Sequence, residues 1–306
     1  MLKAAGYGCH IGNVFFGALA YADDIILLAP TRQAVQCMLD ICDRFGEEFN
    51  VIFNPDKSKR IIFSNSPPPT NVADVVLSGK HIPVVKTDIH LGNPIGSSIC
   101  DFQINRMVND LNWRTNVLLY QFKHVFHKTK YFLFNKLCLS LYGSPLLNMC
   151  SKSADRLYVT WRKCVRRVLN LPSRTHSNYI PTICDDVSLS IKIQRRFLKF
   201  IYSIISSDND LIRMCANIVV NGSSSNVCCN LNYLCSKLCI SKLRFLEMSN
   251  HDIETFGRKL RDDSHSAETQ SKISVIKELL NMREVCDNNV LCFEEIDNLL
   301  GNLCVT

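Results

Sequence analysis

Two adjacent aspartates, Asp23 and Asp24, lie in the middle of the apolar run ALAYADDIILLAP at residues 18–30. Burial of one carboxylate is unfavourable, and a second negative charge beside it increases the cost unless a positive partner is present. The sequence contains no Lys or Arg between Lys3 and Arg32. The pair therefore needs a counter-charge from outside the local sequence.

The residues around this pair have the apolar, β-rich composition of strands. Residues 11–20 and 25–29 are predicted to be two strands joined at Tyr-Ala-Asp-Asp, which places the carboxylates at the tip of a hairpin. Gly17 in the first run permits close approach of another backbone. Thr31 is the expected N-cap of a following helix that ends near Glu48.

Further short elements are expected behind this helix. Strands are predicted over residues 49–53 and 60–64, on either side of a turn at Asn54-Pro55-Asp56. A second hairpin is predicted from residues 75–77 and 82–85, which flank Ser-Gly-Lys-His. Together with the first hairpin and its helix, these elements indicate a compact α+β unit.

Positive charge is concentrated in the middle third of the chain. Residues 101–200 contain 17 Lys and Arg but 5 Asp and Glu, a net charge of +12, whereas the whole chain carries +7. This third also has long helical patterns. A field of this sign attracts polyanions such as nucleic acids, although a solvated helical surface is the alternative.

The sixteen cysteines are scattered through the sequence, which shows no secretory signal and no apolar segment of membrane length. We interpret them as reduced thiols of an intracellular protein, in the nucleus or the cytoplasm and not secreted, with no membrane partner. The tightest group, Cys228, Cys229, Cys235 and Cys239, lacks the C-x-x-C spacing and the His pair of a zinc site.

Two vicinal carboxylates on a rigid hairpin are suited to hold divalent metal ions. Mg²⁺ prefers hard oxygen ligands and usually takes only one or two carboxylates, which leaves positions for water and phosphate. Two such ions about 4 Å apart stabilise the attacking and leaving oxygens of a phosphoryl transfer. Mg²⁺, or Mn²⁺ in its place, is therefore the expected counter-charge for Asp23 and Asp24.

Three motifs of this chain occur in the order of a known family. Residues 10–45 read HIGNVFFGALAYADDIILLAPTRQAVQCMLDICDRF, followed by FNPDKSKRIIF and HLGNPIG. The first segment closely resembles the catalytic palm hairpin of reverse transcriptases from non-LTR (LINE-type) retrotransposons, with its Tyr/Phe-Ala-Asp-Asp box. The second resembles the family's Asn-x-x-Lys-Ser/Thr element and the third its Leu-Gly primer-grip turn. The resemblance covers about residues 6–205.

The resemblance implies a fold and an activity. The α+β chain would begin with a partial polymerase palm of antiparallel β-hairpins and a packed helix, followed by an all-α thumb and a helical C-terminal region. Residues 1–99 would be the C-terminal part of the palm with the primer-grip hairpin, 100–206 the basic thumb and following helices, and 207–306 a helical region of unknown role. The implied activity is that of an RNA-directed DNA polymerase, a nucleotidyltransferase acting on an RNA template, a DNA primer and deoxynucleoside triphosphates.

The same resemblance assigns roles to residues near the hairpin. Asp23 would be the main metal ligand, and Asp24 would ligate or orient beside it. Tyr21 would line the primer and nucleotide side of the tip, where Ala22 leaves room for them. Lys57 matches the proposed general acid for the pyrophosphate leaving group, a role for which Lys59 is a nearby competitor.

Nucleic-acid contacts are implied farther along the chain. Leu91 and Gly92 would hold the primer terminus. Four basic residues at helical spacings around Trp161 would contact phosphates independently of base sequence. These residues are Arg162, Lys163, Arg166 and Arg167.

The family also uses a third aspartate on an earlier palm strand and a fingers region that binds the nucleotide. Both precede the hairpin in the family, whereas here the hairpin begins close to Met1. We therefore expect a truncated polymerase that is inactive alone, and its status as an enzyme stays open. The alternative is a non-catalytic nucleic-acid-binding remnant of a retroelement.

Overall fold

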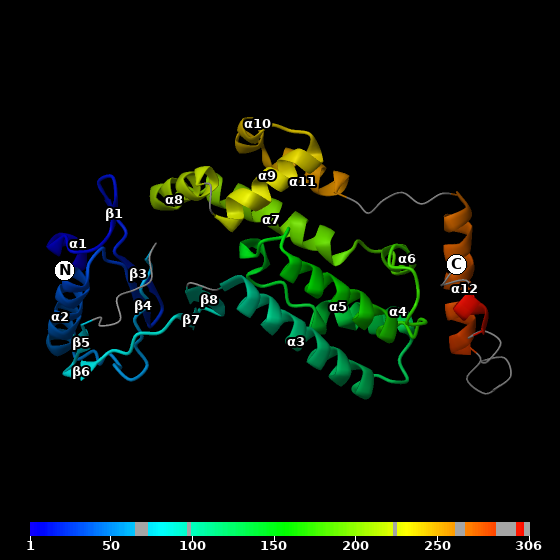
Figure 1. Ribbon diagram of the computed structural model, residues 1–306, viewed down its shortest axis with the longest axis horizontal. Helices are drawn as coiled ribbons and strands as arrows, with labels where there is room; N and C mark the ends of the chain where they lie inside the picture. Colours follow the sequence, from blue (N-terminus) through cyan, green and yellow to red (C-terminus); the bar gives the residue numbers. More distant parts are fainter. Residues whose placement is uncertain (65–72, 97–98, 223–224, 261–266, 286–297, 303–306) are drawn as a thin grey trace. The chain divides into compact units, whose positions relative to one another are not determined.

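The structure is a computed structural model that describes residues 1–64, 73–96, 99–222, 225–260, 267–285 and 298–302. Its elements are labelled in Figure 1. The chain divides into two compact units: unit 1 comprises residues 1–99 and 207–215, and unit 2 comprises residues 100–206 and 216–306. The expected α+β class is confirmed, because helices occur together with small antiparallel hairpins. The division into palm, thumb and C-terminal region stays a prediction.

The described strands of unit 1 form two-stranded antiparallel hairpins, in which each odd-numbered strand pairs with the strand that follows it. They are β1 (His10–Ile11), β2 (Val14–Phe15), β3 (Ala18–Tyr21), β4 (Asp24–Leu27), β5 (Val76–Leu77), β6 (Lys80–His81), β7 (Thr87–His90) and β8 (Asn93–Gly96).

The single strand predicted over residues 11–20 is interrupted. Gly12 has a φ of 57° and, with Asn13, forms a turn between β1 and β2, which is possible because glycine tolerates the left-handed region. The chain then enters β3 through Gly17, where an added Cβ atom would lie 2.5 Å from the Cα atom of Gly8. The close backbone approach predicted at Gly17 is therefore confirmed.

A short helix, a long helix and loops pack with these hairpins in unit 1. α1 (Leu2–Ala5) is followed by α2 (Arg32–Phe49), whose N-cap is Thr31, as predicted: the Oγ1 atom of Thr31 accepts a hydrogen bond from the Ala34 N–H at 3.1 Å. The helix buries Leu39 against Val75, Leu77 and Ile82, the small core of this unit.

The strands predicted over residues 49–53 and 60–64 are wrong. Asn50 ends α2 in the left-handed conformation, with a φ of 55°, and the chain after it remains irregular. In the second segment, Arg60 forms an isolated parallel bridge with Val84. The first segment is largely exposed, with Ile52 93% exposed, and the second is only partly buried. Neither has a partner strand beside it among the described residues, and an apolar segment forms a strand only where the tertiary structure supplies one.

The apolar residues around the β3–β4 hairpin remain incompletely covered. Val14, Phe16, Ile26 and Leu28 are only half-buried, and within the described ranges no further strand pairs with either edge of this hairpin. Open strand edges next to apolar surface favour association between chains.

We therefore expect residues 1–99 produced alone to self-associate, whereas residues 101–206, with their larger share of buried helix, should stay more soluble. Size-exclusion chromatography with light scattering measures both. A monodisperse, cooperatively unfolding 1–99 fragment would show that this segment closes its own core.

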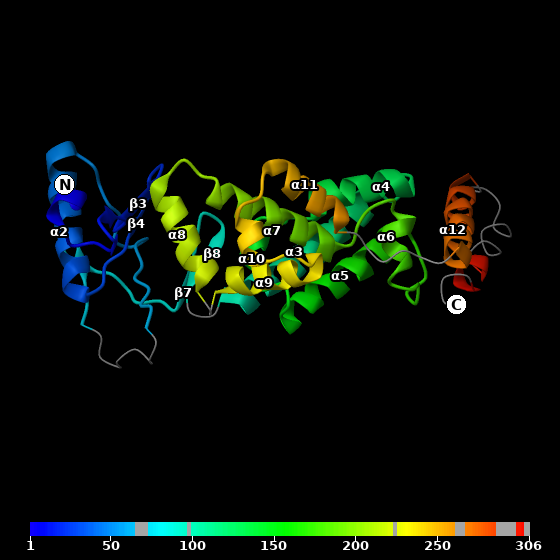
Figure 2. The ribbon, with the colours of Figure 1, turned by 90° about the horizontal axis from the view of Figure 1, so that it is seen from above.

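The regular elements that the structure describes in unit 2 are all helical, as Figures 1 and 2 show. Its elements are α3 (Ile99–Gln121), α4 (His127–Leu133), the π-helical turn η1 (Phe134–Cys138), the 3₁₀ turn η2 (Ser144–Leu146), α5 (Lys152–Val168), α6 (Tyr179–Ile183), α7 (Leu189–Ile205), α9 (Asn226–Leu238), α10 (Lys242–Leu246), α11 (Asn250–Lys259) and α12 (Ala267–Val285), while α8 (Asp210–Asn221) begins in unit 1 and ends in unit 2.

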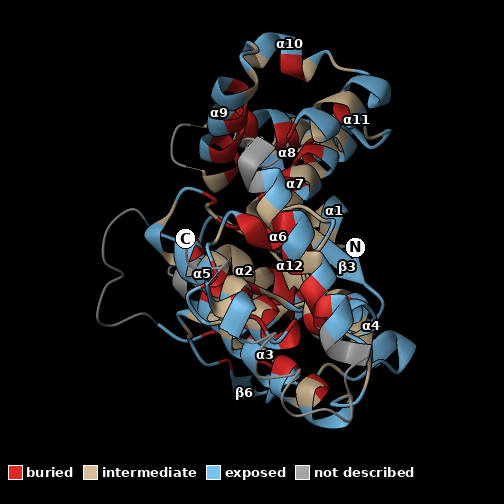
Figure 3. Cartoon of the chain, turned by 90° about the vertical axis from the view of Figure 1, so that its right-hand side faces the viewer, coloured by how far each residue is buried: buried red, intermediate tan, exposed pale blue. Residues whose placement is uncertain are grey.

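A continuous apolar core holds these helices together. Its largest fully buried side chains are Trp161 of α5, Phe134 of η1 and Phe197 of α7. Figure 3 shows the buried residues gathered between the helices and the exposed ones on their outer faces. This core fixes α3, α5 and α7 as rigid supports for the side chains on their solvent faces.

A polar cluster joins α4, η1 and α7 at the edge of this core. The Asp186 carboxylate accepts hydrogen bonds from the Tyr131 hydroxyl at 2.8 Å and from the Lys192 ammonium at 2.5 Å. Lys192 also donates to the Asn135 amide oxygen at 2.8 Å. Burial works to raise the pKa of Asp186, but the hydrogen bond and charge of Lys192 outweigh it and hold that pKa below its usual value.

Asp186→Asn should lower the free energy of unfolding by about 2 kcal/mol at neutral pH, because the partly buried Lys192 would lose its anionic partner. A carboxyl whose folded-state pKa is depressed stabilises above its unfolded pKa of about 4, and this contribution is lost as pH falls through the lower folded-state value. Urea unfolding from pH 7 to pH 3 should therefore show the gap to the native chain closing with acid. The adjacent Asp185→Asn is the control, because it removes only a solvent-exposed ion pair, with Lys277, and such pairs contribute little to stability. An equal loss there would contradict the assignment.

Candidate catalytic hairpin and nucleic-acid interface

The β3–β4 hairpin presents the two aspartates at its tip, as the sequence predicted. Tyr21 pairs with Asp24, so Ala22 and Asp23 form a two-residue loop. Ala22 has a φ of 52°, and two-residue hairpin loops require a positive φ at this first position. Asp23 therefore occupies the loop itself, and Asp24 begins the returning strand.

Both carboxylates face solvent. Asp23 and Asp24 are exposed, and neither side chain has a hydrogen bond or an ion pair with any described residue. The burial cost suggested by the apolar flanks does not arise, because the strands carry the pair beyond the apolar part of the hairpin. Their oxygens are accessible hard ligands.

The hairpin register also fixes what lies beside the carboxylates. Cross-strand partners share a face, so Tyr21 and Asp24 lie side by side, in line with the Leu19 and Ile26 pair. The Tyr21 side chain is 66% exposed. An aromatic ring next to a carboxylate at an open tip can contact a planar or sugar-like group bound there.

The donor set suits a divalent cation but is incomplete by itself. Carboxylate oxygens are the ligands that Mg²⁺ and Mn²⁺ prefer, and Asp23 and Asp24 supply them. Across the part of the chain that the structure describes, no group of three or more His, Cys, Asp or Glu is placed to hold a metal ion. A metal bound at this tip would draw its remaining ligands from water, substrate or another polypeptide segment.

Lys57 lies on an ordered turn in unit 1. The Asn54 Oδ1 atom accepts hydrogen bonds from the backbone N–H groups of Asp56 at 3.0 Å and Lys57 at 3.2 Å, and the Ser58 hydroxyl donates to the Asn54 carbonyl at 2.8 Å. This Asx turn explains why Asn and Ser flank the lysine at these spacings.

The structure distinguishes the two candidate lysines. Lys59 forms an ion pair of 2.8 Å with Asp88, and the hydrogen bond from Lys59 lowers the Asp88 pKa. The Lys57 side chain is exposed and makes no ion pair within the described residues. Lys57 is therefore the more available proton donor of the two.

Leu91 and Gly92 form the two-residue loop between β7 and β8. Their φ values are 47° and 76°, so both adopt the left-handed conformation of the tight hairpin turn. Glycine favours this conformation and leucine does not, so the leucine is held there by the pairing of His90 with Asn93. Such strain at an exposed hairpin tip is compatible with a binding role.

The four predicted phosphate contacts on α5 do not share one face. Lys163 and Arg167 are exposed, whereas the Arg166 guanidinium donates to the Thr175 carbonyl at 3.0 and 2.7 Å and to the Ser177 hydroxyl at 3.1 Å. Arg166 therefore tethers the loop that follows α5. Arg162 is half-buried, and that burial lowers its pKa, with a smaller opposing effect of Asp155.

Lys163 and Arg167 instead align with two residues that the sequence reasoning missed. Lys152 and Arg156 are exposed about three and two turns before Lys163 on α5. The spacings of 4, 7 and 4 residues place the four cations along one line, about 22 Å long at 1.5 Å per residue. We call Lys152, Arg156, Lys163 and Arg167 the basic stripe. Its signal in the sequence is this periodicity, rather than the local density of charge around Trp161.

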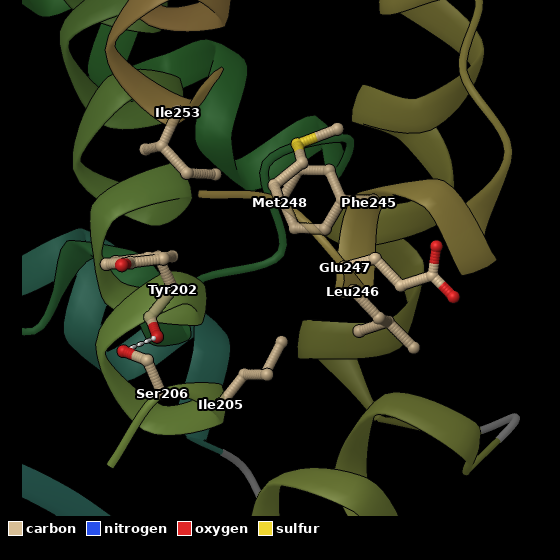
Figure 4. Close-up of a pocket in the computed structure, with 8 residues that line it drawn as sticks. All are labelled: Tyr202, Ile205, Ser206, Phe245, Leu246, Glu247, Met248 and Ile253. Carbon is tan, nitrogen blue, oxygen red and sulfur yellow. Dashed lines mark hydrogen bonds between the residues drawn. The ribbon is translucent and has the colours of Figure 1, made fainter. Parts of the chain in front are cut away.

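A hollow in unit 2 is unrelated to these residues. It has a volume of about 280 Å³ and lies where the end of α7 meets α10 and α11 (Figure 4). Its lining is mainly apolar and contains none of the predicted site residues. The lining residues are Tyr202, Ile205, Ser206, Phe245, Leu246, Glu247, Met248 and Ile253.

A scan of protein-family models, a search of curated proteins and a search of solved structures find no match to this chain. In the described segments, no helix combines the length and apolar content required to cross a bilayer.

Proposed function

We propose that this chain carries the catalytic palm hairpin of a reverse transcriptase, an RNA-directed DNA polymerase of a non-LTR retrotransposon. The observation that carries the proposal is the exposed Asp23-Asp24 pair on a two-residue hairpin loop, with Tyr21 beside it. A hairpin that holds two solvent-facing carboxylates without a protein partner suits metal-assisted phosphoryl transfer to a primer 3′ end.

In this proposal each site residue of the chain has its own role. Asp23 and Asp24 hold Mg²⁺ or Mn²⁺, which would supply electrostatic stabilisation of the charge that develops on the reacting phosphate. Lys57 donates a proton to the leaving pyrophosphate, Tyr21 contacts the nucleotide or primer, and Ala22 leaves room beside it. Leu91 and Gly92 support the primer end.

The nucleic acid is held by charge. Unit 2 contributes the basic stripe, in which Lys163 and Arg167 are joined by Lys152 and Arg156. Contacts from such a row to phosphates position the RNA template strand without reading its sequence. The palm and thumb assignment of units 1 and 2 belongs to this proposal.

The test is primer extension on an RNA template by a chimera in which the fingers and upstream palm strand of a related reverse transcriptase precede Met1. The proposal requires synthesis that depends on Asp23. A chimera that extends primers equally well with Asp23→Ala would contradict the assignment of the site.

A second candidate, a non-catalytic nucleic-acid-binding module, is favoured by the basic stripe, which needs no metal to act. The two candidates differ in one measurement. Both predict nucleic-acid binding, but only the first predicts Asp23-dependent synthesis when the remaining ligands and the nucleotide site are supplied.

A further inference from the structure

The solvent face of α3 carries an aromatic and polar row. Residues at spacings of three and four form one line along the helix, and all of them are exposed; Trp113 is 65% exposed and Tyr120 is 85% exposed. We call this row the aromatic stripe. It consists of Phe102, Arg106, Asn109, Trp113, Asn116 and Tyr120.

The opposite side of α3 is firmly packed. Ile104, Leu111, Thr115 and Leu118 are buried in the core of unit 2. The aromatic rings therefore extend from a rigid helix and do not contribute to the fold. Exposed aromatic side chains grouped on one rigid face are typical of binding surfaces, whereas single scattered ones are not.

The aromatic stripe borders the basic stripe. The Arg167 Nη2 atom donates to the Asn116 Oδ1 atom at 2.6 Å, and the Cys164 thiol donates to the Asn112 Oδ1 atom at 3.6 Å. The later residue of α3, Asn116, contacts the later residue of α5, Arg167, so the two helices run parallel here. Figures 1 and 2 show them side by side.

The dimensions of the paired stripes suit a polynucleotide strand. Trp113 and Tyr120 are two helical turns apart, about 10.5 Å along the axis, which is roughly three steps of 3.4 Å in a stacked strand. The cations of the basic stripe lie on the neighbouring helix α5, and the axes of packed helices are about 8–10 Å apart. A backbone could follow the basic stripe while its bases reach the rings.

We propose that the α3–α5 face binds single-stranded nucleic acid, with bases stacked on Trp113 and Tyr120 and phosphates along Lys163 and Arg167. Charge complementarity with the +12 of residues 101–200 favours a polyanion. A duplex stacks its bases on one another and offers only edges and phosphates, whereas an unpaired base can stack on an aromatic ring. The inference rests on the nucleic-acid part of the proposed function, not on its chemistry.

Fluorescence anisotropy with a labelled single-stranded RNA of about 12 nucleotides tests the proposal in the full chain. The double variant Trp113→Ala and Tyr120→Ala should weaken binding by about 10- to 100-fold, because each stacked base contributes strongly to affinity. The same variant should bind an abasic strand of equal length as well as the native chain does, since that strand offers phosphates alone. Phe132→Ala, an exposed aromatic on α4, is the matched control and should change neither affinity.

Intrinsic fluorescence gives a second readout, because the chain has two tryptophans and they differ in environment. Trp113 is exposed, whereas Trp161 is buried and its Nε1 atom has no hydrogen-bond partner among the described residues. Trp161→Phe therefore removes no hydrogen bond and leaves Trp113 as the single reporter. Single-stranded RNA should quench this emission, and the abasic strand should leave it unchanged.

Three results would overturn the proposal: equal loss of affinity for the RNA and the abasic strand, tighter binding of the matching duplex than of the single strand, or a change in oligomeric state of the double variant. The last would assign the aromatic stripe to contact between two copies of the chain. The polymerase proposal is read from primer extension by the chimera and this one from RNA binding by the full chain, so failure of the first is distinguishable from failure of the second.

Discussion

Asp23→Ala should reduce primer extension by about 10³-fold or more in the chimera that carries the fingers and upstream palm strand of a related reverse transcriptase before Met1. Residues 1–306 alone should give no measurable extension with either Mg²⁺ or Mn²⁺. The hairpin supplies two carboxylates, and no described residue completes a three-ligand group with them. A single-turnover assay on a primed RNA template measures both effects.

The size of this effect follows from the exposed position of the hairpin tip. The side chains of Asp23 and Asp24 do not stabilise the fold, because neither forms a hydrogen bond or an ion pair with a described residue. Their removal should therefore leave stability unchanged while it removes metal ligands, and electrostatic stabilisation supplies much of the catalysis in phosphoryl transfer. An unchanged melting temperature would separate loss of chemistry from loss of folding.

The matched control is Asp40→Asn, an exposed aspartate on α2 whose carboxylate accepts a hydrogen bond from the Gln36 side chain at 2.7 Å. It changes the same net charge in the same unit and should leave extension within about twofold of the parent chimera. Robust synthesis by the unmodified 1–306 chain would contradict the need for additional ligands. Extension indifferent to Asp23 would remove the hairpin from the mechanism.

Replacing all four cations of the basic stripe by Gln should lower affinity for nucleic acid by roughly 10³-fold at 0.1 M salt, with the difference vanishing towards 1 M. Each phosphate contact contributes about 0.7–0.9 to the slope of log affinity against log salt, so the slope should fall by about 3. Filter binding over roughly 0.05–0.5 M salt gives both the affinity and its dependence on salt.

A variant with the same change of charge elsewhere in unit 2 tests whether nucleic-acid affinity depends on the basic stripe or on the overall positive charge of the unit. Four exposed cations outside the stripe, on the α3–α4 connection, α4 and α7, can be changed to Gln: Lys123, Lys128, Arg196 and Lys199. This control should shift affinity far less than the stripe variant does. Equal losses from the two variants, or a wild-type slope near zero, would contradict a defined interface.

The sequence alone determined the local features of unit 1. The apolar runs around Asp23 and Asp24 predicted a hairpin with its carboxylates at the tip, and Thr31 predicted the start of α2, because turns and caps depend on neighbouring residues. The turn at Asn54 was predictable for the same reason. The strand predictions over 49–53 and 60–64 failed because an apolar segment becomes a strand only where a partner strand lies beside it.

Only the tertiary structure decided which charged side chains have partners within the protein and which remain available to a ligand. Lys57 and Lys59 are two residues apart, yet Lys59 pairs with Asp88, 29 residues later, and Lys57 does not. Arg166 and Arg167 are adjacent, but one tethers the loop at Thr175 while the other meets Asn116 on α3. A side chain's partners come from distant parts of the chain, so sequence spacing fixes its direction on a helix but not what it meets there.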